Sequence, residues 1–305
     1  MRNKHVRPPV FIIGVGRSGS SVFHRTLCQH PHVAWLSRLL EWAPRSVQRN
    51  RLLMHALDFP WVGNWLANHF EPSECYAYWD SLYPGFSEPV RDLVADDVSV
   101  DVAPRIIQSF RRQLTDRRSQ LVVKITGWSR LDFLYRVFPD ARFIHILRDG
   151  RPVAASFLRV DWWDGWRGPN QWRYGPLTPA QDDEWRRHNL SFIALAAIQW
   201  KILMDAMESA KRACPQAALL ELRYEDCCDD PMLLFRRAAE FCELPWLPRF
   251  ERAVGATRLR SENDKWRRDF TPEQQGVLDT VLHDHLVRYG YADLEPERHT
   301  AATSA

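Results

Sequence analysis

The chain has 305 residues, of which 45% are hydrophobic and 26% are charged, and its formal net charge is only +3. This balance is that of an ordinary globular protein, and the length is sufficient for one large α/β domain. The small positive surplus argues against a nucleic-acid-binding protein, which would need many clustered basic residues. It is compatible with one local pocket for a small polyanion.

Membrane insertion and secretion have no support in the sequence. No run of about 18 apolar residues occurs, so no transmembrane helix is predicted. The basic segment 1–9 is followed by a short apolar run, 10–13, which is too short for the central region of a signal peptide. The six cysteines form no CxxC pair and no zinc-ligand spacing, which favours reduced thiols. We therefore expect a cytoplasmic protein.

The first third of the chain predicts a strand, a helix, a second strand and then an irregular region. The first strand is wholly apolar, as in a parallel sheet covered on both faces, and the helix after it has apolar residues at helical spacing. The irregular region is rich in Trp, Pro and Asp and is expected to form short helices and loops. In chain order these segments are 10–13, 20–28, 33–36 and 42–100.

Strands and helices alternate more regularly after residue 120. In chain order we predict a strand at 121–124, a helix at 131–137, a strand at 143–147, helices at 151–158 and 184–213, a strand at 218–222, and helices at 231–241 and 271–290. The alternation predicts a single α/β domain over residues 1–291, with a central parallel sheet of about five strands flanked by helices. Residues 292–305 are small and polar and are expected to form a disordered tail.

The most informative segment is the glycine-rich stretch 14–21, between the first predicted strand and the first predicted helix. Glycines allow a tight turn in which successive N–H groups and the start of a helix face one anion, so the segment predicts a phosphate site. Gly14, Gly16 and Gly19 fit the GxGxxG fingerprint of dinucleotide-binding proteins, but no acidic residue ends the second strand to bind a ribose. Gly14 and Gly19 also have Walker-A spacing, but Ser20 stands where the lysine of an ATPase should be.

A family resemblance is carried by five consecutive residues, Arg17, Ser18, Gly19, Ser20 and Ser21. They resemble the 5′-phosphosulfate loop of sulfotransferases that use 3′-phosphoadenosine 5′-phosphosulfate (PAPS), which commonly reads [RK]-S-G-[TS]-[TS]. The resemblance implies a phosphate-loop α/β fold in which these residues bind PAPS. It also implies transfer of a sulfuryl group to a hydroxyl or amine of an acceptor. A glycan, a lipid, a phenol and a secondary metabolite all remain open as that acceptor.

A second match follows the predicted strand 143–147. Arg148 leaves the carboxyl end of that strand, where ligands bind in open α/β sheets, and Ser156 lies eight residues later. In sulfotransferases an arginine and a serine at this spacing bind the 3′-phosphate of PAPS, and the resemblance implies the same role here. A planar guanidinium suits a phosphate. The alternative is a surface arginine that pairs with Asp149 or Asp226.

Lys124, which ends a predicted strand, resembles the lysine that sulfotransferases place against the transferring sulfuryl group. The alternative is a solvated strand end. The histidine base that small-molecule sulfotransferases carry two residues later is replaced here by Thr126. A hydroxyl acceptor needs a base, and the candidates are His24 on the first helix, Glu41 after the second strand and Glu74 in the irregular region.

Three further segments are candidates for contact with the acceptor or the nucleotide. Residues 161–172 hold four tryptophans and are the expected acceptor site, because aromatic faces stack on sugars and apolar ligands; a hydrophobic plug is the alternative. Residues 223–226 and 261–271 resemble a Tyr-Glu-Asp segment and a basic segment that lie near the nucleotide in sulfotransferases.

Since Arg17 and Lys124 would supply the positive charge, no metal is expected. A Rossmann-type NAD(P) oxidoreductase and a non-catalytic nucleotide-binding protein remain alternatives.

Overall fold

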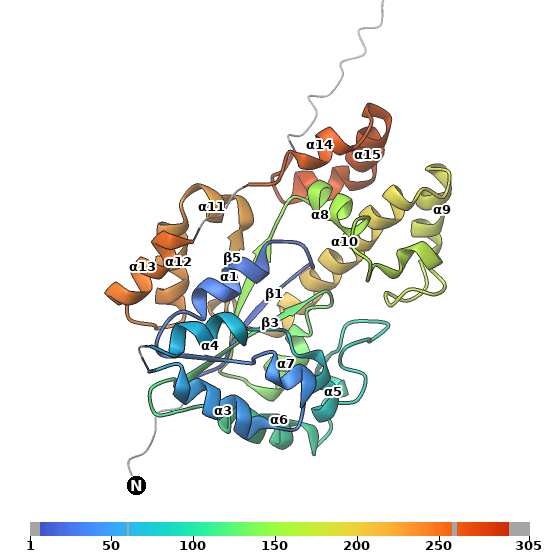
Figure 1. Cartoon of the computed structure of the whole chain (residues 1–305). Coiled ribbons are helices and arrows are strands. Elements are labelled where there is room, and N and C mark those ends of the chain that lie inside the picture. Colours follow the sequence, from blue (N-terminus) through green and yellow to red (C-terminus); the bar gives the residue numbers. More distant parts are fainter. Residues whose placement is uncertain (1–6, 60, 258–260, 293–305) are drawn as a thin grey trace, which may run out of the picture.

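The computed structural model describes residues 7–59, 61–257 and 261–292. Its centre is one five-stranded sheet in the order β2-β3-β1-β4-β5, in which every neighbouring pair is parallel (Figure 1). This confirms the predicted α/β fold. The strands are β1 (Val10–Gly14), β2 (Val33–Trp35), β3 (Gln120–Thr126), β4 (Arg142–Leu147) and β5 (Leu219–Arg223).

Helices surround the sheet (Figure 1). In the described part of the chain they are α1 (Ser20–Leu27), α2 (Leu39–Trp42), α3 (Val47–Ala56), α4 (Gly63–His69), α5 (Tyr76–Leu82), α6 (Val102–Arg111), α7 (Leu131–Val137), α8 (Gly150–Phe157), α9 (Pro179–Arg187), α10 (Phe192–Ala210), α11 (Tyr224–Asp229), α12 (Pro231–Phe241), α13 (Pro248–Ala256), α14 (Lys265–Asp269) and α15 (Pro272–Arg288). Short 3-10 turns lie at Ala95–Asp97, Asp164–Arg167, Lys211–Ala213 and Gln216–Ala218.

The strand order explains why both faces of the sheet are covered. The chain moves in one direction along the sheet from β1 through α1 to β2, and in the other direction from β3 through α7 to β4. Because such crossovers are right-handed, α1 and α7 lie on opposite faces. The chain therefore leaves β1 toward one edge of the sheet and leaves its neighbour β4 toward the other edge, and such a divergence is where open α/β sheets bind ligands.

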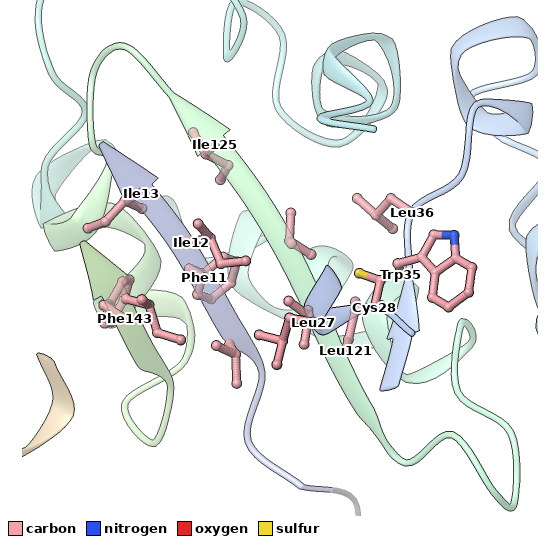
Figure 2. Close-up of a cluster of buried hydrophobic side chains, with 14 of the residues drawn as sticks. Phe11, Ile12, Ile13, Leu27, Cys28, Trp35, Leu36, Leu121, Ile125 and Phe143 are labelled. Carbon is pink, nitrogen blue, oxygen red and sulfur yellow. The ribbon is translucent and has the colours of Figure 1, made fainter. Parts of the chain in front are cut away.

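Strand β1 is wholly buried, and its side chains pack on both faces of the sheet. The ring of Phe11 lies 6.0 Å from that of Phe110 on α6 and 5.8 Å from that of Phe138, which follows α7. On α1, Phe23 stacks on Phe235 of α12 at 4.8 Å. Figure 2 shows how side chains of β1, β3 and α1 fill the space beside the strands. The apolar run 10–13 thus forms the centre of the core, as its composition predicted.

One predicted element is wrong, because the single helix over 184–213 is in fact α9 and α10. The chain between them turns at Asn189 and Leu190, which both have a φ of 54°. Ser191 then caps α10, its side chain accepting a hydrogen bond from the Ile193 N–H at 3.1 Å. The amphipathic pattern came from α10, which buries ten residues, whereas α9 buries none.

The sequence also predicts features of the C-terminal tail, the domain bounds, the cysteines and membrane insertion. The predicted tail lies outside the described residues apart from residue 292, and the single domain over 1–291 stays a prediction. All six cysteines are free thiols. Of the helices in the described ranges, none has both the length and the apolar composition to cross a membrane. Helices α6, α11, α13 and α14 lie where no element was predicted.

A buried histidine links α1 to the segment before α13. The Nε2 of His30 contacts the carbonyl oxygen of Pro245 at 2.9 Å, and its Nδ1 accepts from the His32 N–H at 3.1 Å. These partners require one ring nitrogen that carries a proton and one that does not, so the imidazole is in its neutral form. Burial lowers the pKa of His30 to about 4, against the weaker opposing effect of the Pro245 carbonyl.

We expect the free energy of unfolding to fall between about pH 7.5 and about pH 5. In this range the unfolded chain protonates His30 near its ordinary pKa of 6.5, whereas the folded chain does not. The unfolded state therefore gains roughly 2 kcal/mol from this one residue. Urea unfolding at both pH values measures the loss, which should be about 2 kcal/mol smaller in His30→Gln. Equal losses in wild type and variant would refute the argument, and exposed His55→Gln is the control.

Candidate active site

The turn between β1 and α1 is shaped to hold an anion. Gly14 has a φ of 151°, and a Cβ there would lie 2.6 Å from the carbonyl oxygen of Ile146, so β4 approaches only because the residue is glycine. Gly19 has a φ of 84°, and its Cβ would meet the Tyr224 ring at 2.2 Å. The first turn of α1 holds no acidic residue, so its N–H groups are available to an anion. Ser18 is buried, and its Oγ has no hydrogen-bond partner among the described residues.

Three predicted nucleotide-binding side chains meet beside this turn. The Nε of Arg17 donates to Ser156 Oγ at 2.8 Å, and Nη1 of Arg148 donates to the main-chain carbonyl of Arg17 at 2.9 Å. The Arg148 guanidinium lies over the Tyr224 ring at 4.3 Å, and its Nε donates to Asn263 Oδ1 at 2.9 Å. Arg148 is thus held at the turn by a carbonyl, an aromatic face and an amide. Ser20 and Ser21 are the first two residues of α1, after this turn.

Two segments that the sequence singled out support Arg148. Glu225 accepts from Asn263 Nδ2 at 2.7 Å and from the hydroxyl of Tyr291 at 3.0 Å. It also accepts from the Asp149 N–H at 3.3 Å. The Tyr-Glu-Asp segment 223–226 therefore lies at the predicted site. Segment 261–271 reaches the site through Asn263, a residue that its basic composition did not point to.

Lys124 is not a solvated strand end, because the residue is only 8% exposed. It lies two residues before the end of β3, where its Nζ is 2.7 Å from Ser21 Oγ and 2.7 Å from Glu74 Oε1. Thr126, which replaces the expected histidine, donates its hydroxyl to the same carboxylate at 3.0 Å. The ammonium is therefore held between the start of α1 and Glu74.

A cavity of about 280 Å³ lies over Lys124 and is lined by His24, Glu41 and Glu74. His24 is 1% exposed, and burial together with the charge of Lys124 lowers its pKa to about 3. Such a ring resists protonation and is a weak base. Glu41 accepts from Ser73 Oγ at 2.9 Å. Of the three candidates, Glu74 is the one in direct contact with Lys124.

The tryptophan-rich segment 161–172 divides between the core and the site. Trp163 and Trp172 are buried, so these two side chains have the packing role that was the alternative to an acceptor site. Trp162 is 51% exposed and lies over the glycine turn, where its ring would come within 3.8 Å of a Cβ on Gly16. An aromatic face is thus available beside the turn.

Comparisons with known proteins identify the family of the chain. A family model described as the sulfotransferase family matches residues 8–248. The omega-hydroxy-beta-dihydromenaquinone-9 sulfotransferase Stf3 of Mycobacterium tuberculosis is 24% identical, over 95% of this chain and 77% of that protein. The crystal structure of sulfotransferase STF9 from Mycobacterium avium shares the fold, with a TM-score of 0.56 at 19% identity over 96% of this chain and 78% of that one. Since the family model matches well over half of its length, the chain belongs to the sulfotransferase family and transfers a sulfuryl group to an acceptor.

Proposed function

We propose that the sulfuryl donor is PAPS, bound by the glycine turn and by the cluster of Arg17, Arg148 and Ser156. The observation that carries the proposal is the pair of contacts from Arg17 to Ser156 and from Arg148 to the Arg17 carbonyl. They gather two guanidinium groups and a hydroxyl beside an anion-binding turn, a donor set that suits a second phosphate group. The family match favours this donor over the dinucleotide that the GxGxxG spacing also allowed.

The catalytic part of the proposal concerns Lys124. Sulfuryl transfer is an in-line displacement in which negative charge grows on the oxygens around the bond that breaks. The Lys124 ammonium lies 2.7 Å from Ser21, at the start of α1, so it is within reach of a group bound at the turn. A fixed cation at that point stabilises the transition state more than the bound donor.

We assign the proton acceptor to Glu74. The acceptor hydroxyl must lose its proton as the sulfuryl group arrives, and the receiving group has to line the cavity over Lys124. Burial and the neighbouring Lys124 ammonium oppose protonation of His24. Glu74 is kept in place by Lys124 and Thr126, and one carboxylate oxygen is enough to receive the proton.

The acceptor in this proposal is a small molecule or lipid that carries a hydroxyl group. The mycobacterial relative is named for an omega-hydroxy compound. A cytoplasmic location belongs to the same proposal.

The donor is tested by Arg148→Ala. We expect the affinity for adenosine 3′,5′-bisphosphate to fall by about tenfold or more, because charged hydrogen bonds to the 3′-phosphate are lost. The affinity for adenosine 5′-monophosphate, which lacks that group, should fall much less, because only the support that Arg148 gives to the turn is lost. Calorimetric titration of both nucleotides measures the two values, and Arg159→Ala, an exposed arginine paired with Asp269, is the control. Equal losses for both nucleotides would show that Arg148 does not bind the 3′-phosphate.

Lys124→Met keeps the length of the side chain and removes its charge. Turnover at saturating PAPS should fall by about 10²–10³, because a preorganised cation is missing from the transition state. The dissociation constant for adenosine 3′,5′-bisphosphate should stay close to that of the wild type, since the sulfuryl group is absent from this ligand. A variant that turns over at the normal rate would give Lys124 a purely structural role.

Glu74→Gln keeps the shape of the side chain and an oxygen that accepts from Thr126. We expect turnover to fall by about 10²–10⁴, with little effect on nucleotide binding, because the amide is not a base. Glu41→Gln changes another carboxylate in the lining of the same cavity; it is the matched control and should retain turnover. If Glu41→Gln proved the slower enzyme, the base would be Glu41 instead.

A further inference from the structure

A second and larger cavity, of about 780 Å³, lies beside the one over Lys124. Arg25, Glu71 and Pro72 line both, so the two are neighbours along the length of α1. The larger cavity reaches Cys28 at the end of α1 and lies between α4 and α13, which flank α1 in Figure 1. Its position gives an acceptor room to extend away from the reaction site.

Positive charge dominates the wall of this larger cavity. Glu71, the one carboxylate among its described lining residues, lies 2.8 Å from Arg25. Arg249 and Arg252 are exposed and lie three residues apart on α13, so they share one side of that helix. The arginines that line the cavity are Arg25, Arg118, Arg249 and Arg252.

Arg118 shows most directly that this wall suits an anion. Its side chain is buried against the Trp35 ring, with the guanidinium carbon 5.3 Å from the ring centre. Its Nη2 pairs with Asp58 at 3.2 Å, but its Nε has no hydrogen-bond partner among the described residues. Its Nη1 donates to the Val33 carbonyl at 2.7 Å, so the guanidinium is held in place and adds a fixed positive charge to the wall. Burial and the nearby charges of Arg117 and Arg249 lower the pKa of Arg118, against the pull of Asp58.

The remaining lining residues are largely apolar and include Trp35, Leu57, Ala67 and Pro72. From Ser21 at the reaction site to Cys28 in this cavity the chain advances about 10 Å along α1. A ligand that lies in both cavities would therefore be long, would pass the Arg25–Glu71 ion pair where the cavities meet, and would be anionic at the far end.

We propose that the larger cavity is the acceptor site and selects an elongated hydroxyl compound whose opposite end carries a carboxylate or phosphate. The hydroxyl lies at Lys124 and Glu74, and the anionic end lies at Arg118, Arg249 and Arg252. This inference rests on the proposed function, and it names the substrate class for the same site. Guanidinium groups bind either anion in a bidentate manner, so both anions are tested.

The experiment measures binding to protein saturated with adenosine 3′,5′-bisphosphate, a complex that cannot turn over. The three probes have the same length of alkyl chain. They are ω-hydroxydecanoate, its uncharged methyl ester, and decanediol monophosphate. We expect at least one anionic probe to bind about tenfold or more tightly than the ester. The double variant Arg249→Ala/Arg252→Ala should lose this preference and leave binding of the ester unchanged. The exposed pair Arg111→Ala/Arg112→Ala removes the same charge from α6 and should keep the preference.

The other possible outcomes overturn different parts of the proposal. Equal affinity for all three probes in the wild type, or no binding of either anion, overturns the proposed selectivity. A preference that survives in Arg249→Ala/Arg252→Ala overturns the assignment of the anionic end to these two arginines. If adenosine 3′,5′-bisphosphate itself does not bind, the proposed donor fails, and that result is visible before any probe is added.

Discussion

The site depends on one hydrogen bond, donated by the side chain of Arg148 to the main-chain carbonyl of Arg17. It joins the end of β4 to the turn that follows β1, so that the two cationic side chains belong to one rigid unit. Tyr224 completes this unit by contacting both Arg148 and Gly19. Because the guanidinium of Arg148 is oriented before any ligand arrives, little side-chain freedom is left to lose on binding.

The parallel sheet sets the distance between this cluster and the reacting centre. Gly14 pairs with Thr126 across β1 and β3, while Ile13 pairs with His145 across β1 and β4. The glycine turn therefore lies between Lys124 on one side and Arg148 on the other. A shift of one residue in either pairing would turn the side chains of that strand to the other face and separate the groups.

The sequence was sufficient for the parts of the site that depend on local pattern. Arg17 follows β1, Arg148 follows β4 and Ser156 lies in the last turn of α8; apolar spacing identifies these elements, and strand ends in a parallel sheet meet at one edge. The sequence named Glu74 among three candidate bases but did not predict its contact with Lys124, and it did not point to Asn263, which is 115 residues from Arg148. Such contacts are decided by packing. The break between α9 and α10 did leave a signal, the Ser191 cap, but the strong apolar pattern of α10 obscured it.

The central position of β1 has a consequence for the order in which the molecule is assembled during synthesis. This wholly apolar strand is made first, yet its neighbours are β3, at residues 120–126, and β4, at residues 142–147. More than a hundred residues must be translated before either edge of β1 is paired. Contacts so distant in sequence make folding slow, and they leave an apolar strand exposed on the nascent chain meanwhile. The buried strand at the centre of the finished enzyme is therefore an aggregation risk while the chain is being made.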